Sequence, residues 1–164
     1  MKRILVVMAV FMVGLLILPV SVRADEKQAA ISDNCGTIKE NLKKVQKQDA
    51  RTRVYLGGYY EKILSKFMIP LNVRLVENNL ANAKLTENQN NFADAKILFM
   101  NDYVDYQQGL EELVMMDCKN ESESFYKKLM KVREEREVVN RDVATMRKII
   151  SEHMKLVKEL KGKL

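Results

Sequence analysis

The C-terminal stretch from Phe125 to Leu164 carries an apolar repeat that leaves few choices of fold. Steps of three and four residues define one stripe, which consists of Leu129, Val132, Arg136, Val139, Val143, Met146, Ile150, His153, Val157, Leu160 and Leu164. Only Arg136 and His153 are not apolar. A spacing of about 3.5 residues, with no proline and no glycine before Gly162, is typical of a long helix that packs along partner helices as in a coiled coil. The preceding chain must supply those partners.

Two earlier segments have matching patterns. Residues 36–78 repeat the spacing at Ile38, Leu42, Val45, Asp49, Thr52, Leu56, Tyr59, Ile63 and Phe67. Residues 81–116 repeat it at Leu85, Phe92, Ala95, Phe99, Tyr103, Tyr106, Leu110 and Leu113. Asparagine-rich residues 78–83 and polar residues 117–124 favour turns. We therefore predict an all-α fold, an elongated antiparallel three-helix bundle or coiled coil over residues 35–164.

Two features disturb the first predicted helix. The Gly57-Gly58 pair costs about 2 kcal/mol relative to two alanines. Pro70 removes one backbone hydrogen bond and crowds the preceding turn, so a kink is expected near Lys66. The alternative architecture is a bundle of four helices with a break at Gly57-Gly58.

The N-terminal residues have the pattern of an export signal. Lys2 and Arg3 precede an apolar run, and Ala24 ends a suitable cleavage sequence, so residues 1–24 are predicted to be a signal peptide. The alternative is an uncleaved membrane anchor over residues 4–22. In both cases the basic N-terminus stays in the cytoplasm and the rest faces outward, secreted or extracytoplasmic. Residues 25–34 are polar and non-periodic, and are predicted to be a flexible leader.

The two cysteines are predicted to form one disulfide. An exported chain enters an oxidising compartment, which favours pairing Cys35 with Cys118. Antiparallel packing of the first two helices brings both residues to the same end of the bundle. Two distant thiols and one histidine are too few for a metal site, so no metal or other cofactor is expected.

Charge is distributed unevenly along the chain. Three of the 28 basic residues precede the predicted cut, which leaves 25 against 22 acidic residues. Residues 36–78 have a net charge of +5, residues 81–117 of −5 and residues 122–164 of +5. This pattern favours placing the acidic helix between the basic ones. The candidate anion-contact residues near the C-terminus are Arg147, Lys148, Lys155, Lys158, Lys161 and Lys163. The simpler interpretation of this run is a solvated helix end that complements the helix dipole.

The polar and aromatic exceptions have structural interpretations. Arg136 is expected to snorkel, or to pair with an acidic residue of the second helix and fix the register; the alternative is anion binding. His153 is expected to be a structural histidine on the stripe; the alternative is a pH-sensitive group or a ligand. The aromatic residues of the second helix are expected in the core. Three tyrosines, at positions 55, 59 and 60, surround the glycine pair, where they mark either a groove or a close helix approach.

Four features resemble secreted helical proteins of candidate-phyla bacteria. These are Cys35 at a helix start, the cluster of Phe99, Asp102, Tyr103 and Tyr106, Cys118 before the next helix, and the segment 133–147. The resemblance implies an exported bacterial helical protein. It implies no activity, cofactor or site residue.

No pattern of catalytic residues is apparent, so the chain is not expected to be an enzyme. The sequence favours an exported, non-enzymatic helical scaffold or adaptor of the cell envelope that acts through surface contacts. The alternatives are a periplasmic-type holdase chaperone and a protein that binds polyanions or anionic surfaces through its basic helix ends. A protein partner or self-association is expected, membrane contact only through an uncleaved N-terminal segment, and nucleic acid binding is not expected.

Overall fold

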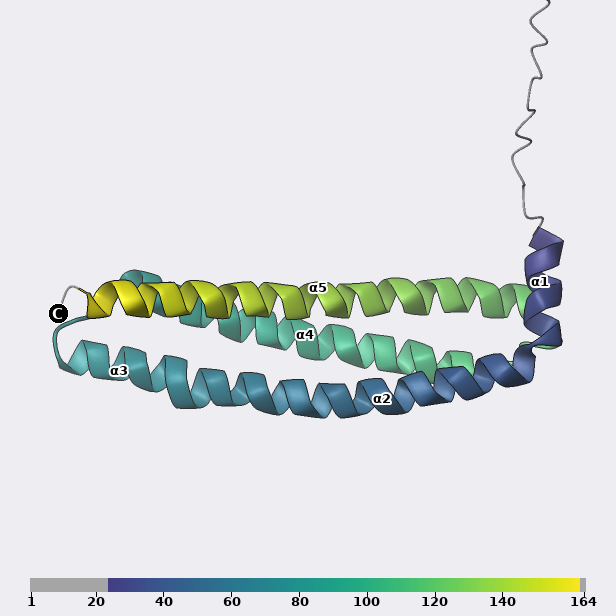
Figure 1. Ribbon diagram of the computed structural model, residues 1–164, viewed down its shortest axis with the longest axis horizontal. Coiled ribbons are helices and arrows are strands. Elements are labelled where there is room, and N and C mark those ends of the chain that lie inside the picture. The colour runs from purple at the N-terminus through teal and green to yellow at the C-terminus, as the bar shows by residue number, and fades with distance from the viewer. Residues whose placement is uncertain (1–23, 163–164) are drawn as a thin grey trace, which may run out of the picture.

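The computed structural model describes residues 24–162, and most of these are helical (Figure 1). The predicted signal segment over residues 1–24 lies, except for Ala24, outside the described residues, as do Lys163 and Leu164. The helices are α1 (Ala24–Asp33), α2 (Cys35–Lys62), the π-helix η1 (Ile63–Met68), α3 (Ile69–Glu77), α4 (Ala83–Met115) and α5 (Ser122–Lys161).

The predicted all-α bundle is confirmed. The segments α2, η1 and α3 form one continuous curved rod, α4 returns along it, and α5 reverses again, while α1 lies across the end of the bundle (Figure 1). The backbone of α4 closely approaches both α5 and the first rod. Over their described lengths, the backbones of α2 and α5 do not approach each other closely. The bundle is therefore built around α4.

The buried face of α4 matches the predicted stripe. Its buried residues are Leu85, Asn88, Phe92, Ala95, Phe99, Tyr103, Tyr106, Gly109, Leu110 and Leu113. Tyr60 of α2 packs edge-on against Phe92 and Phe99, with ring centroids 6.0 and 5.8 Å apart. Such edge-to-face pairs add about 0.5–1.5 kcal/mol beyond the area that they bury. The aromatic residues of α4 belong to the core, as predicted.

The first rod is continuous through the glycine pair, so the alternative break at Gly57-Gly58 does not occur. The irregularity lies further on, where the π-helix η1 spans the predicted kink near Lys66. The Ile69 N–H donates to the Leu64 carbonyl, five residues back. This wider turn immediately precedes Pro70, which has no N–H to donate and whose ring crowds the preceding turn.

The side chains of the first rod that face the core differ from the predicted stripe around the π-helix. Tyr59 and Phe67 were predicted on the buried stripe, but they are 46% and 67% exposed. Tyr60, Leu64 and Met68 are buried in their place. The shift is already present at Tyr60 in α2, ahead of η1. A strict 3.5-residue repeat does not persist through η1, because a π-helix takes more residues per turn than an α-helix.

The predicted flexible leader over residues 25–34 is instead helical and forms α1. Ile31 is buried, and the Ser32 hydroxyl donates to the Lys119 carbonyl at 3.0 Å. The Lys27 ammonium lies 5.5 Å from the ring centroid of Tyr126 on α5. These contacts are made with distant parts of the chain, which the local composition does not reveal.

The two ends of the bundle are closed differently. At one end, Cys35 and Cys118 form the predicted disulfide, with Cα atoms 5.5 Å apart. At the other, the chain reverses between α3 and α4 at the predicted place. Asn79 adopts the left-handed conformation there, with φ of 57°. The Asn82 side chain caps α4 by accepting from the Leu85 N–H at 3.2 Å.

Candidate functional site

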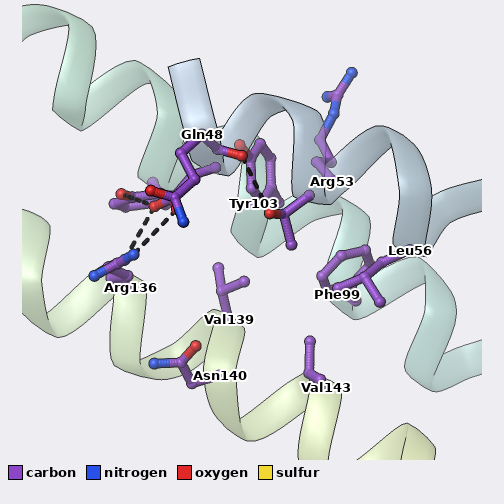
Figure 2. A pocket seen from close by; sticks show the side chains of 12 residues that line it. Gln48, Arg53, Leu56, Phe99, Tyr103, Arg136, Val139, Asn140 and Val143 are labelled. Atoms are coloured by element: carbon purple, nitrogen blue, oxygen red, sulfur yellow. Dashed lines mark hydrogen bonds and ion pairs between the residues drawn. The ribbon is translucent and has the colours of Figure 1, made fainter. Parts of the chain in front are cut away.

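A pocket between α2 and α5 is the candidate binding site that all three long helices line. We call it the central pocket; its volume is about 260 Å³. Figure 2 shows α2 and α5 on its two sides and aromatic residues of α4 at its base. The lining residues are Gln48, Asp49, Thr52, Arg53, Leu56, Phe99, Tyr103, Tyr106, Arg136, Val139, Asn140 and Val143. The pocket exists because the backbones of α2 and α5 both approach α4 closely and do not approach each other.

Asp49 joins all three long helices at one end of this pocket. Its Oδ2 accepts from the Arg136 Nε at 3.0 Å, and its Oδ1 accepts from an Arg136 terminal nitrogen, also at 3.0 Å. The Tyr106 hydroxyl donates to Oδ2 at 2.7 Å. The Asp49 side chain is only 14% exposed, whereas that of Arg136 is 50% exposed. A two-point pair with a third donor fixes geometry better than a single surface ion pair does.

The ionisation of this cluster follows from its packing. Burial raises the pKa of Tyr106, and the hydrogen bond to the Asp49 carboxylate raises it further. The hydrogen bond to Asp49 raises the pKa of the Arg136 guanidinium. Tyr106 therefore stays a neutral donor and Arg136 stays a cation at physiological pH.

A second pocket lies further along the same side of the bundle. We call it the distal pocket; it has a volume of about 290 Å³ and is lined by Lys66, Phe67, Pro70, Leu71, Arg74, His153, Met154 and Val157. The first rod and α5 again form its two sides. His153 is 5% exposed, and its Nδ1 lies 3.1 Å from the Asn88 Oδ1 of α4. Burial lowers the pKa of His153.

A pair of carboxyl groups lies between α4 and α5, outside both pockets. The Oδ2 atom of Asp142 is buried without a hydrogen-bond partner. Burial, together with the neighbouring Asp102, raises the pKa of Asp142 to about 6. The pair is a source of pH-dependent stability rather than of binding. Among the described residues, no group of three or more His, Cys, Asp or Glu side chains is placed to hold a metal ion.

The described residues of the predicted basic run have different neighbours. Arg147 lies beside the Tyr60 hydroxyl, where it opposes the rise in the tyrosine pKa that burial causes. Lys148 lies 3.9 Å from Glu152. Lys155 lines a pocket with residues of α4, and Lys163 lies outside the described residues.

The prediction for Arg136 was right about pairing and wrong about the partner. The acidic residue is Asp49, on the first long helix rather than the second. Asp49 is the one charged residue on the stripe of residues 36–78, and Arg136 is a charged residue on the C-terminal stripe. These two charged residues were the signal in the sequence for a pair. His153 has its predicted structural place, but its partner Asn88 gave no such signal because asparagines are numerous in that segment.

The tyrosines near the glycine pair do not mark a close helix approach. A Cβ added at Gly58 would meet no atom within 4 Å, and one at Gly57 would lie 4.0 Å from the Met100 Sδ. Tyr55 and Tyr59 lie parallel and exposed, with ring centroids 6.5 Å apart. Close approach instead occurs at Gly109, where α4 meets Glu135 and Val132 of α5.

The described helices include none with the length and apolar character needed to span a bilayer. The disulfide between Cys35 and Cys118 is compatible with an extracytoplasmic location. Comparisons with protein-family models, with curated proteins and with solved structures found no match to the chain.

Proposed function

We propose that this chain is an exported, non-enzymatic scaffold or adaptor of the cell envelope that binds an acidic segment of a partner protein in the central pocket. The observation that carries the proposal is the open side of the bundle between α2 and α5. Both rods that border this opening have an excess of basic residues, and their backbones do not approach each other closely. A partner with negative charge complements that surface.

The chemistry of the pocket supports a segment that carries both a carboxylate and an apolar side chain. Arg53 lies 5.3 Å from the ring centroid of Tyr103, and it makes no ion pair with a described residue. Its guanidinium is available to a carboxylate, unlike that of Arg136, which Asp49 holds. Leu56, Val139 and the aromatic rings of α4 supply apolar contacts beside it.

Export supports the cellular setting. The basic and apolar N-terminal residues have the pattern of a signal segment. A disulfide forms and persists in oxidising compartments, and the chain uses both of its cysteines in one. The rod-like bundle displays a long surface relative to its core, which suits a protein that acts by contact.

A photo-crosslinking amino acid at Asn140 tests this function in intact exporting cells. Asn140 is exposed and lines the central pocket. The matched control is Asn101, which is exposed on α4 and does not line this pocket. We expect a crosslinked partner at position 140 and not at position 101, and mass spectrometry should locate the crosslink in a segment of net negative charge.

Charge reversal makes the crosslinking test specific. Arg53→Glu should suppress the crosslink at position 140, and 0.5 M salt, on the order of several times physiological ionic strength, should weaken it because exposed charges are screened. Equal crosslinking at both positions, or a crosslinked segment without excess acidic residues, would overturn the proposal.

A holdase chaperone is the second candidate, because several large apolar side chains are exposed. Tyr55, Phe67, Val76 and Met115 are 71%, 67%, 63% and 82% exposed. Exposed apolar surface can bind unfolded chains. Suppression of the aggregation of a heat-unfolded client at equimolar protein, measured by light scattering, would favour this candidate over a scaffold.

Polyanion binding is the third candidate. Binding of soluble polyanions whose affinity falls steeply as the salt concentration rises would favour it.

A further inference from the structure

His153 presents a buried polar atom that the fold does not satisfy. Its Nδ1 faces the Asn88 Oδ1, while its Nε2 is buried and has no hydrogen-bond partner among the described residues. Buried polar atoms of this kind are rare, and each one calls for a partner. Because Nδ1 is turned toward α4, Nε2 lies on the opposite edge of the ring, away from Asn88.

The distal pocket adjoins this histidine. It combines an apolar interior with two cations from the first rod, Lys66 and Arg74. Phe67 and Met154, both more than half exposed, line it on opposite sides. Its volume of about 290 Å³ is at the lower end of the roughly 300–1,000 Å³ typical of small-molecule sites, which suits a small ligand.

We propose that the distal pocket binds a carboxylate with a short alkyl chain. The carboxylate accepts from the Nε2–H of a protonated His153 and is attracted by Lys66 and Arg74. The alkyl chain lies against Phe67, Leu71, Met154 and Val157. Since Nε2 is buried, the ligand reaches it after a side-chain rotation of Phe67 or Met154.

Binding of this ligand is coupled to one proton. Without ligand, His153 is neutral, its Nδ1–H donates to Asn88, and Nε2 is an unpaired acceptor. A carboxylate accepts and does not donate, so His153 must take a proton from solvent to bind it. Burial lowers the pKa of the ring, so protonation needs the ligand carboxylate as a counter-charge. The nearby charged groups are Lys66 and Arg74, which line the distal pocket, and Lys84, Glu87, Glu152, Lys155 and Glu159, which line the pocket on the Asn88 side.

The single histidine of the chain allows a direct test by NMR. Nitrogen-15 spectra of the imidazole report which ring nitrogen carries a proton, with no competing histidine signal. The probe is octanoate, titrated into the purified protein at pH 6.5, with octanol as the uncharged control. We expect octanoate to move the Nε2 resonance from the position of an unprotonated to that of a protonated nitrogen, and octanol to leave it unchanged.

Two variants distinguish the effect of the pocket cations Lys66 and Arg74 from the effect of the overall charge of the protein. Lys66→Gln with Arg74→Gln should weaken octanoate binding by about two- to fivefold, as expected for partly exposed charges. Lys155→Gln removes a cation from the other side of the Asn88–His153 pair and should leave the affinity unchanged. An imidazole spectrum that octanoate does not alter, or that octanol alters equally, would overturn the proposal. The test uses the isolated protein, so it does not depend on partner binding in the central pocket.

Discussion

The carboxyl group of Asp142 is the clearest case of a residue whose ionisation works against the fold. Burial and the proximity of Asp102 raise the pKa of Asp142 to about 6, from an ordinary value near 3.8. The folded protein therefore binds more protons than the unfolded chain between about pH 4 and pH 6. By linkage, the free energy of unfolding falls as the pH rises through this interval. Above it, two negative charges face each other between α4 and α5.

Asp142→Asn should stabilise the protein at neutral pH. We expect a gain of about 1 kcal/mol at pH 7.5, because asparagine removes the repulsion, and solvent screening reduces the effect below the full value that the pKa shift implies. The gain should shrink as the pH falls from about 6 and vanish below about pH 3, where the aspartic acid is protonated in both states. Urea unfolding at a series of pH values measures both quantities.

The control for Asp142 is Asp94→Asn, at an exposed position on α4. It should leave the pH dependence unaltered. His153 contributes a slope of the opposite sign, since its lowered pKa means that stability is lost as the pH falls below about 6.5. The variant must therefore be compared with the parent protein at each pH. An Asp142→Asn protein that is less stable at pH 7.5 would contradict this account.

The polar cluster at the central pocket shows how far single residues were predictable. Asp49 and Arg136 both lie on apolar stripes, and a charged residue on a buried stripe requires a partner. The pairing of Asp49 with Arg136 could therefore be predicted from the sequence, because each is a charged residue on a buried stripe. Asn88 and the Asp102–Asp142 pair were not, because which polar residues face each other depends on the axial register of two helices.

At the scale of the helices, the periodicity predicted where each long helix runs in the sequence better than which of its side chains face the core. The predicted stripes of the second and third helices lie in the core almost without change, because those helices are regular. In the first rod the buried side chains are the neighbours of Tyr59, which lies in α2 just before the π-helix, and of Phe67, which lies within it. The sequence showed that the ring of Pro70 would crowd the preceding helical turn. It did not show whether a wider turn or a sharp bend relieves that crowding, because either can do so. Residues 25–34 were missed because their helix is held by contacts with α5 and the disulfide end.

Glycines in two helices have opposite roles, which a pair of substitutions can reveal. Gly58 lies in regular helix with open space around its Cα, so Gly58→Ala should stabilise by about 0.5–1 kcal/mol through a smaller loss of backbone entropy. Gly109 lies between α4 and α5, where an added Cβ would collide with the Glu135 Oε2 and lie 3.2 Å from the Val132 Cγ2. Gly109→Ala should therefore destabilise.

Thermal unfolding followed by circular dichroism measures both glycine variants under the same conditions. Equal stabilisation by the two alanines would mean that α4 and α5 do not approach closely at Gly109. A destabilised Gly58→Ala protein would mean that a partner or a bend occupies the space beside the glycine pair.

At the scale of the whole molecule, burial rather than charge determines how the rods are arranged. Ion pairs between different long helices join Asp49 to Arg136, Glu61 to Lys96 and Glu112 to Lys128. Only the last joins an acid of α4 to a basic helix, as the net charges predict. Exposed pairs contribute roughly 0–1 kcal/mol each, which is small beside the aromatic core along α4. The excess basic charge of the outer rods therefore remains largely available to a partner.

The disulfide fixes one end of this elongated bundle, where α1, the start of α2 and the connection before α5 meet. It links residues 83 apart in the sequence, and closing a loop of that length stabilises the folded state by about 4 kcal/mol in the chain-entropy model. Cys118 is fully buried, and the Ser32–Lys119 hydrogen bond lies beside it. Loss of the bridge should therefore weaken both the global stability and the docking of α1.

The double variant Cys35→Ser, Cys118→Ser should unfold at clearly lower denaturant with nearly unchanged helix content under native conditions. The apolar stripes of α4 and α5 do not depend on the bridge, whereas α1 is held by few contacts. Amide hydrogen exchange should consequently accelerate in α1 more than in the middle of α4, which provides an internal control within one molecule. Thiol labelling of the native parent protein should find no free cysteine. Two reactive thiols per chain, or an unfolding midpoint that the double substitution does not change, would show that packing alone holds this end of the bundle.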